Sequence, residues 1–306
     1  MFDGKNVSHI LPFTKPEYKT ARQKDAKRIS ISGVQTKHSL RLNKKILELT
    51  DQGGGYILKP VPNGDFDRMQ EMPANEHVTM QLATQVFGLD VAANGLVFFE
   101  DGEPAYLTKR FDQEPDGSRK LQEDFAQLAG RTEESNGSNY KYDSSYEEIA
   151  DLMRKFIGPY AIEAEKYFRL VLFNYLIQNG DAHLKNFSVF RDPGQGIYVL
   201  TPAYDLMNTR LHLPTEADTA LDLFKDDFAT ESYEANAYYA KDDFLELGKR
   251  MGMGMERVKM IIAAMIGKTG EVETLIGRAR LEEKTKNDYL AQVNDRVKRL
   301  NYTFKK

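Results

Sequence analysis

Cysteine is absent from the 306-residue sequence, which excludes disulfide bonds and thiolate metal sites. This absence fits a reducing compartment. The sequence also lacks any run near the roughly 20 apolar residues that a membrane-spanning helix needs. Its first ten residues, MFDGKNVSHI, contain no apolar core of signal-peptide length. We therefore expect a cytoplasmic protein that does not enter a membrane.

Several catalytic patterns are missing as well. The five histidines show neither H-x-x-x-H nor H-E-x-x-H spacing, which disfavours a zinc hydrolase, and we expect His183 to be structural. No G-x-S-x-G occurs, and a thiol nucleophile is impossible without cysteine. The triplet Gly53–Gly55 is not followed by Lys-Ser or Lys-Thr. It is therefore not a Walker loop, and we interpret it as a hairpin tip.

The composition is that of a soluble globular protein, with 41% hydrophobic and 29% charged residues. The length suffices for one large or two modest domains. A net charge of −4 argues against a nucleic-acid-binding surface along the whole chain. Residues 1–50 nevertheless contain eleven Lys or Arg against four Asp or Glu, an excess of seven. Such an arm is suited to phosphate or an acidic partner, and equally to a solvated terminus.

The first third of the chain alternates apolar and polar residues in the way that strands do. We expect strands at residues 28–33, 38–43, 44–50, 55–60, 94–100 and 104–112. A helix is predicted from Ala74 to Phe87, with Asn75 as its N-cap and Gly88 as its stop signal.

The rest of the chain predicts mainly helices. Leu121, Phe125 and Leu128 form a short apolar stripe, and residues 131–145 lack an aliphatic core residue, which predicts a mobile loop. A capping box, either Ser144 with Glu147 or Ser145 with Glu148, precedes a helix. Further apolar stripes predict helices near residues 168–176, 255–266 and 289–300. The sequence thus predicts an α+β chain with a strand-rich lobe at 1–110, a helical lobe at 111–306 and a cleft between them.

The polar segment NGDAHLKNFSVF carries one candidate site. Asp181 and Asn186 are separated by four residues, giving the D-x-x-x-x-N spacing of a protein-kinase catalytic loop. In such a loop the carboxylate accepts the proton of a substrate hydroxyl and the amide holds Mg²⁺, while Lys185 is placed to neutralise phosphoryl charge. The structural alternative is a helix capped at Asn179-Gly180 and followed by a polar turn.

A second carboxylate strengthens the catalytic interpretation. Asp205 follows a short apolar run and lies 24 residues beyond Asp181 (205 − 181). A kinase needs a metal-binding Asp downstream of its catalytic loop, and Mg²⁺ takes one or two protein carboxylates together with phosphate oxygens. Asp205 with Asn186 would satisfy this demand. The alternative is an ordinary Asp in the turn after a strand.

The third element lies in the first lobe. Lys59 ends the apolar strand GYILKP, where a cation buried without an anion would be costly. Its position suits a lysine that grips nucleotide phosphates, and Glu76 is its candidate ion-pair partner. The alternatives are a lysine that points into solvent and a solvated glutamate near a helix N-terminus. SISGVQTK, Ser30 to Lys37, offers hydroxyl and backbone N–H groups, and we prefer it as the phosphate-covering loop.

The sequence resembles the HipA family of bacterial serine/threonine kinases in seven segments. In order along the chain, these are SISGVQTK, YILKP, NEHVTMQLA, YLTKRFD, QEDFAQL, NGDAHLKNFSVF and LTPAYDLM. The resemblance covers about residues 28–208. It implies a bilobal protein-kinase-like fold related to the phosphoinositide 3/4-kinase branch. It also implies ATP with Mg²⁺ and phosphoryl transfer to a protein hydroxyl.

Carried over by motif, the resemblance makes Asp181 the catalytic base and Asn186 and Asp205 the metal ligands. Lys59 would bind phosphates, and the connector at residues 108–111 would be the hinge that meets adenine. The full set of expected site residues comprises Asp181, Asn186 and Lys185 in catalysis, Asn186 and Asp205 at the metal, and Lys59, Glu76, Ser32, Gly33, Val34, Gln35, Lys109 and Phe111 at the nucleotide.

The resemblance also implies regulation and partners. Some family members phosphorylate a serine in the phosphate-covering loop and so silence themselves, and Ser30 and Ser32 stand at that place. The best-known members are toxins that phosphorylate an aminoacyl-tRNA synthetase, and a small helix-turn-helix antitoxin restrains them and provides the contact with DNA. Because only about thirty residues precede the loop, we expect a short form in which the family's N-terminal subdomain is absent or encoded separately. The alternatives are a kinase of a small molecule or lipid and a nucleotide-binding co-repressor.

Overall fold

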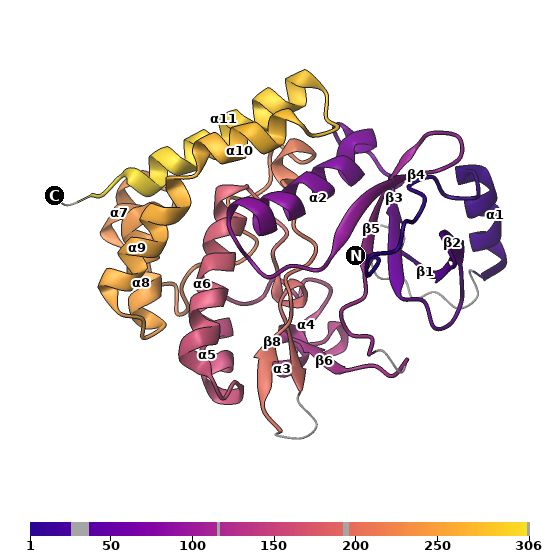
Figure 1. The fold of residues 1–306 in the computed structure, drawn as a ribbon. Helices are drawn as coiled ribbons and strands as arrows, with labels where there is room; N and C mark the ends of the chain where they lie inside the picture. The colour runs from indigo at the N-terminus through magenta and orange to yellow at the C-terminus, as the bar shows by residue number, and fades with distance from the viewer. Residues whose placement is uncertain (26–36, 115–116, 192–195, 305–306) are drawn as a thin grey trace. The chain divides into compact units, whose positions relative to one another are not determined.

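The computed structural model describes residues 1–25, 37–114, 117–191 and 196–304. The chain divides into two compact units (Figure 1). The first comprises Met1–Val78 and Ala92–Arg119, and the second comprises Thr79–Val91 and Lys120–Lys306. Residues 111–119 therefore fall in the first unit and residues 79–91 in the second, whereas the sequence analysis divided the chain after residue 110.

An antiparallel five-stranded sheet organises the first unit, with the strand order β2-β1-β3-β5-β4. Its elements are α1 (Lys15–Asp25), β1 (His38–Asn43), β2 (Ile46–Leu49), β3 (Tyr56–Pro60), β4 (Asn94–Phe98) and β5 (Pro104–Lys109). Five of the six predicted strands are confirmed, β1 with the predicted bounds and the other four with shorter ones. The strand expected at residues 28–33 lies outside the described residues.

The two faces of β3 differ in chemistry. Leu58 and its cross-strand partner Leu107 both belong to the apolar core of the first unit. The next pair in the register is Lys59 with Tyr106. Because successive side chains of a strand point to opposite faces, Lys59 lies on the face opposite to that core. It is nevertheless 3% exposed, so this second face is buried too.

The helix predicted at residues 74–87 is present but differs in detail. The turn η2 (Met69–Glu71) leads into α2 (Met72–Gln81), which continues as the π-helix η3 (Leu82–Val86). The prediction that Asn75 caps this helix was wrong, because the helix begins at Met72 and Asn75 is buried within it. Gly88 does follow the last turn with a φ of +62°, as a stop signal requires.

The second unit combines helices with the antiparallel sheet β6-β7-β8. Its strands and short turns are β6 (Leu121–Asp124), η4 (Leu184–Asn186), β7 (Ser188–Arg191), β8 (Tyr198–Leu200) and η5 (Thr209–Leu211). Its helices are α3 (Phe125–Leu128), α4 (Glu133–Asn136), α5 (Tyr146–Phe156), α6 (Tyr160–Leu176), α7 (Glu231–Asn236), α8 (Lys241–Arg250), α9 (Met255–Ile266), α10 (Thr269–Gly277) and α11 (Glu283–Asn301).

One predicted helical stripe in this unit was wrong. Leu121 lies in β6, where it pairs with Arg191 of β7, while Phe125 and Leu128 begin and end the four-residue helix α3. Pairing with β7 makes residues 121–124 a strand in spite of the helical spacing. Asp124 then caps α3 by accepting a hydrogen bond from the Gln127 N–H. The helix therefore begins only after the strand has ended.

The core of the second unit surrounds α6. The five residues of its predicted apolar stripe, Phe168, Val171, Leu172, Tyr175 and Leu176, are all at most 2% exposed. That prediction is therefore confirmed. The helices α10 and α11 pack against each other in this unit, as Figure 1 shows in yellow and orange. Among the described residues, every helix is too short or too polar to cross a lipid bilayer.

Candidate active site

The candidate catalytic loop begins where α6 ends. Gln178 adopts a left-handed conformation with a φ of +55° and donates its N–H to the Tyr175 carbonyl at 3.2 Å. Asn179 donates its N–H to the Asn174 carbonyl at 2.9 Å. These two bonds form a Schellman motif in which Gln178 is the left-handed residue. The expectation that Asn179-Gly180 caps the helix was therefore wrong by one or two positions.

Gly180 has a different role, which is to allow close approach. Its N–H donates to the Thr209 hydroxyl at 2.7 Å, and that hydroxyl donates to Glu216 Oε1 at 2.5 Å. A Cβ at position 180 would lie 2.6 to 2.9 Å from the carboxylate atoms of Glu216. Burial raises the pKa of Glu216 to about 7, although the Thr209 hydrogen bond opposes this shift. A partly buried carboxyl group thus lies directly behind the loop.

The side chain of Asp181 is 52% exposed. Its Oδ1 accepts a hydrogen bond from the Tyr142 hydroxyl at 2.5 Å, and His183 Nε2 lies 3.8 Å from the same oxygen. The backbone N–H of Asp181 donates to Asn179 Oδ1 at 3.2 Å. Asn179 of the loop therefore holds the backbone of Asp181, and Tyr142 holds one of its carboxylate oxygens.

His183 is the buried neighbour of this carboxylate. Burial lowers the pKa of the imidazole to about 4, although Asp181 opposes the shift. The ring is therefore neutral near pH 7. Its Nδ1 is buried and has no hydrogen-bond partner among the described residues. The charge of Asp205 also acts on this imidazole, so both carboxylates lie within electrostatic reach of the same ring.

The short helix η4 places Lys185 and Asn186 after His183. The N–H of Asn186 donates to the His183 carbonyl at 2.9 Å, and the side chains of Lys185 and Asn186 are both half-buried. Lys185 Nζ donates to the Tyr140 hydroxyl at 3.3 Å. A hydroxyl from the 131–145 segment thus contacts each of two candidate catalytic side chains, Asp181 and Lys185.

The β7–β8 hairpin brings Asp205 to this loop. The Tyr204 hydroxyl donates to the Lys185 carbonyl at 2.8 Å and is hydrogen-bonded to Ser188 Oγ at 2.5 Å. The residue before Asp205 therefore contacts the residue before Asn186. Asp205 itself has a φ of +56°, a left-handed conformation that costs a non-glycine residue on the order of 1 kcal/mol or more. Such backbone strain is concentrated at functional sites.

The donor set fits Mg²⁺ held together with a nucleotide. Among residues 1–25, 37–114, 117–191 and 196–304, no three His, Cys, Asp or Glu side chains group to hold a metal ion by themselves. Mg²⁺ usually binds through one or two protein carboxylates plus phosphate oxygens, so such a group is not required. Asn186 and Asp205 supply the hard oxygen donors that this ion prefers.

The first unit contains the other predicted pair. Lys59 Nζ lies 2.5 Å from Glu76 Oε1, and the two side chains are 4% and 3% exposed. The Tyr106 ring lies under the ammonium group at 5.3 Å from its centroid. This burial contradicts the two alternatives in which Lys59 and Glu76 point separately into solvent. The lysine that ends strand β3 is instead held by an acidic residue of α2.

The remaining expected nucleotide residues are less informative. Lys109 ends β5 and its Nζ contacts both oxygens of Asp3, at 2.9 and 3.0 Å. Phe111 follows it in the connector and is half-buried. The loop residues Ser30, Ser32, Gly33, Val34 and Gln35 lie outside the described residues. Lys59 and Glu76 are thus brought together in the first unit, and the catalytic and metal candidates in the second.

Sequence reasoning missed Tyr140, Tyr142 and Glu216. The 131–145 segment was predicted to be a mobile loop, but it contains α4, and its YKY triplet contacts the candidate catalytic loop. Two tyrosines in an otherwise polar segment were the available signal. Glu216 offered no signal, because only the fold places it behind Gly180.

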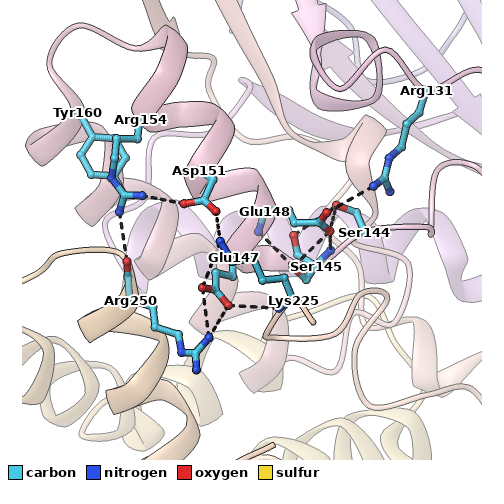
Figure 2. A network of polar contacts seen from close by, with 10 residues as sticks. All are labelled: Arg131, Ser144, Ser145, Glu147, Glu148, Asp151, Arg154, Tyr160, Lys225 and Arg250. Atoms are coloured by element: carbon cyan, nitrogen blue, oxygen red, sulfur yellow. Dashed lines mark hydrogen bonds and ion pairs between the residues drawn. The ribbon is translucent and has the colours of Figure 1, made fainter. Parts of the chain in front are cut away.

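A polar network anchors the end of this segment (Figure 2). Ser145 caps α5 by accepting a hydrogen bond from the Glu148 N–H at 3.1 Å, and Glu148 accepts one from the Ser145 N–H at 2.8 Å. Of the two predicted capping boxes, the one formed by Ser145 and Glu148 is therefore present. Arg131 reaches Glu148 at 3.5 Å, while Glu147 pairs with Arg250 of α8 at 3.0 Å.

The fold is a kinase-like α+β fold. The structure aligns with HipA of Shewanella oneidensis, solved in a complex of a toxin–antitoxin system with HipB and operator DNA. The TM-score is 0.67 at 24% identity, over 95% of this chain and 73% of that one. The chain belongs to the HipA-like C-terminal domain family, whose pattern it matches over residues 29–272.

Two curated relatives agree with this family. A protein provisionally named a kinase, from Haemophilus influenzae, is 28% identical over 299 residues, which are 90% of this chain and 83% of that protein. The serine/threonine-protein kinase toxin HipA of Shewanella oneidensis is 29% identical over 230 residues. The latter match covers 70% of this chain but only 49% of the toxin, so the chain spans about half the length of that relative.

Proposed function

We propose that this protein is an ATP- and Mg²⁺-dependent protein serine/threonine kinase. The observation that carries the proposal is the β7–β8 hairpin, which joins Asp205 to the loop that bears Asp181 and Asn186 through the Tyr204–Lys185 contact. Family membership over residues 29–272 supports the same activity. Lys59, paired with Glu76 in the first unit, is the proposed phosphate-binding lysine.

The proposed step transfers the γ-phosphoryl group of ATP to a hydroxyl. The acceptor hydroxyl gives its proton to Asp181 as its oxygen bonds to the γ-phosphorus. The bond from that phosphorus to the bridging oxygen breaks, and ADP leaves with the electron pair. The exposed carboxylate of Asp181 suits this role because an acceptor can approach it from solvent. Lys185 is placed to balance the charge on the phosphoryl oxygens.

Mg²⁺ would be held by Asn186 and Asp205, and it would neutralise phosphate charge when bound. Asp205 follows β8 along the chain and has a left-handed backbone conformation. On the first unit, the strand end at Lys109 and the following Phe111 are the proposed contacts to adenine. Ser32, Gly33, Val34 and Gln35 are the proposed cover for the phosphates.

The proposal is tested with purified protein, γ-labelled ATP, Mg²⁺ and a hydroxyl-bearing protein acceptor. Asp181→Asn should lower phosphate incorporation by roughly 100-fold or more, because it removes the general base. It should retain Mg²⁺-dependent nucleotide binding, whereas Asp205→Asn should weaken that binding. Equal incorporation by the wild type and Asp181→Asn would show that the assignment is wrong. Label found only in small-molecule products would instead favour a metabolite or lipid kinase.

Self-phosphorylation at Ser30 or Ser32 is part of the proposal. It is supported by the position of both serines in the segment that we assign to phosphate covering. Phosphopeptide mapping after incubation with ATP should find phosphate on one of them, and Ser30→Ala and Ser32→Ala identify which. Active protein in which both serines stay unmodified would contradict this part and leave the kinase assignment intact.

We further propose a protein substrate, such as an aminoacyl-tRNA synthetase, and a small helix-turn-helix partner that provides the contact with DNA. The support is that the Shewanella HipA structure is a complex with HipB and operator DNA. Co-purification with the product of a neighbouring short gene, followed by gel shifts with and without that product, tests the partner. DNA binding by this chain without the partner would contradict the indirect mode.

A further inference from the structure

We infer that Tyr142 is a positioning residue for Asp181, with its hydroxyl fixing one carboxylate oxygen while the other is left to the acceptor. This inference rests on the kinase function proposed above. The direct observation is the hydrogen bond from Tyr142 Oη to Asp181 Oδ1 at 2.5 Å. His183 Nε2 approaches the same oxygen at 3.8 Å, so both neighbours are directed at Oδ1.

Exposure supports this division of the two oxygens. The Asp181 side chain remains 52% exposed although Tyr142 and His183 lie against it. A general base must be within hydrogen-bond reach of the incoming proton. It must also keep its orientation, because a misplacement of about 1 Å at a reacting group can cost roughly 100-fold in rate. A carboxylate held at Oδ1 meets both demands.

Residues 140–142, which include the tyrosine, are held against the loop by contacts of each residue. The Tyr142 ring packs edge-on against the His183 ring, with 5.1 Å between their centroids. The Lys141 carbonyl accepts a hydrogen bond from the Leu184 N–H at 3.1 Å, and the Tyr140 hydroxyl accepts one from Lys185 Nζ at 3.3 Å. Residues 140–142 therefore lie along the candidate catalytic loop and, with the Asp181 hydrogen bond included, contact four of its residues.

The ends of this segment are anchored as well. Arg131 lies before it and reaches Asp143 at 3.7 Å and Glu148 at 3.5 Å, as Figure 2 shows for Glu148. Ser145 lies after it and caps α5. Since both flanks are attached to folded elements of the second unit, the position of the Tyr142 hydroxyl is set by the scaffold and does not depend on a bound acceptor.

Two other roles for Tyr142 are weaker. A phosphoryl acceptor must give up its hydroxyl proton. Burial and the nearby Asp181 raise the pKa of Tyr142, so its hydroxyl keeps the proton and remains a hydrogen-bond donor to Asp181. A plug over the base should cover the carboxylate, yet about half of the Asp181 side chain is exposed. Positioning is therefore the role that the contacts favour.

The test compares Tyr142→Phe with Tyr198→Phe. The first variant removes only the hydroxyl on Asp181. The second removes an equivalent hydroxyl that donates to Glu123 Oε2 at 2.6 Å, outside the proposed site. Tyr142→Phe should lower kcat by roughly 10- to 100-fold, with KM for ATP and acceptor changed by less than about twofold. Tyr198→Phe should leave both parameters near their wild-type values.

A double-variant cycle with Asp181→Asn separates positioning from general destabilisation. If Tyr142 acts through Asp181, adding Tyr142→Phe to Asp181→Asn should reduce the residual rate by less than about twofold. The inference would be overturned by an additive loss in the double variant or by an unchanged kcat in Tyr142→Phe. A higher rate in Tyr142→Phe would also overturn it, because it would show that the tyrosine blocks access to Asp181. Phosphotyrosine at residue 142 would overturn it in favour of an acceptor.

The two failures can be told apart. If the wild type and Asp181→Asn transfer phosphate equally, the proposed function fails and the inference falls with it. If Asp181→Asn is impaired while Tyr142→Phe is not, the kinase function stands and the inference fails. Thermal unfolding of each variant shows whether a lower rate reflects unfolded protein. For a variant that folds only partially, the double-variant cycle still compares its effect with and without Asp181.

Discussion

The two candidate sites hold their charges in opposite ways. In the first unit, Lys59 and Glu76 are 4% and 3% exposed and form an ion pair with each other. In the second unit, Asp181 is 52% exposed, and a neutral hydroxyl and a neutral imidazole lie against it. The first arrangement balances one buried charge with another, and the second leaves one charge partly to solvent.

Because of this difference, substitutions in the first site should affect folding stability, and substitutions in the second should affect the reaction. A charge buried without a partner is costly, so losing either member of the Lys59–Glu76 pair should act on folding as well as on nucleotide binding. A half-exposed carboxylate keeps its hydration, so replacing Asp181 should act on the reaction and hardly on folding. Glu216 is intermediate between these two cases, because it is partly buried beside Gly180 and accepts its hydrogen bond from the neutral hydroxyl of Thr209.

The largest expected change comes from breaking the buried pair. Lys59→Met leaves Glu76 buried without its cation, and the free energy of unfolding should fall by about 3–5 kcal/mol. Urea or thermal unfolding measures this change. The double variant Lys59→Met/Glu76→Leu removes both charges and should recover most of the loss. A single variant as stable as the wild type would show that the pair is not buried in solution.

The next effect concerns the close approach at Gly180. Gly180→Ala places a methyl group 2.6 to 2.9 Å from the Glu216 carboxylate atoms. The carboxylate must then move away from the Thr209 hydroxyl that donates to it, so the protein should lose about 1–3 kcal/mol of stability. Gly270→Ala is the matched control, because a Cβ there meets nothing within 4 Å, and it should be neutral or slightly stabilising. Combining Gly180→Ala with Glu216→Ala should relieve the clash. A double variant that is no more stable than Gly180→Ala would show that the destabilisation does not come from contact with Glu216.

A smaller effect depends on pH. The pKa of Glu216 is raised in the folded state from its ordinary 4.5 to about 7, so the folded protein binds the proton more tightly than the unfolded chain does. This contribution to stability is complete below about pH 4.5 and is lost as the pH rises through 7.

Glu216→Gln should therefore be more stable than the wild type at pH 8, by about 1–2 kcal/mol after allowance for solvent screening of this partly exposed group. The difference between the two proteins should shrink as the pH falls toward 4.5. Unfolding curves at both pH values measure it. A wild-type advantage that grows with pH would reverse the sign and contradict the raised pKa.

The smallest expected change in stability is at the catalytic candidate itself. Asp181→Asn keeps an oxygen that accepts the Tyr142 hydrogen bond and replaces a half-exposed group, so its unfolding free energy should stay within about 0.5 kcal/mol of the wild type. Denaturant unfolding of the same preparation that is used for the kinase assay measures this. A loss as large as that of Lys59→Met would remove the contrast between the two units.

Much of the fold could be read from local patterns. The strand alternation around Leu40 and Leu58 and the helical stripe of Phe168, Leu172 and Tyr175 mark buried faces, and the structure buries them. Boundaries were less predictable. Leu121 was assigned to a helix because its spacing to Phe125 fits one, but the partner strand β7 that decides its conformation is about 70 residues away in the sequence (191 − 121).

For the candidate site, the sequence by itself determined which residues we propose for the chemistry: Asp181 and Asn186 with their D-x-x-x-x-N spacing, the later Asp205, and a lysine at the end of an apolar strand. Those assignments follow from residue type and order, which need no coordinates. Only the tertiary structure decided between an ion pair and two solvated side chains for Lys59 and Glu76, and only it revealed that Tyr142 touches Asp181 and that Glu216 lies behind Gly180. These pairs are separated by 17 to 39 residues, and their contact depends on how folded elements pack, which local sequence patterns do not encode.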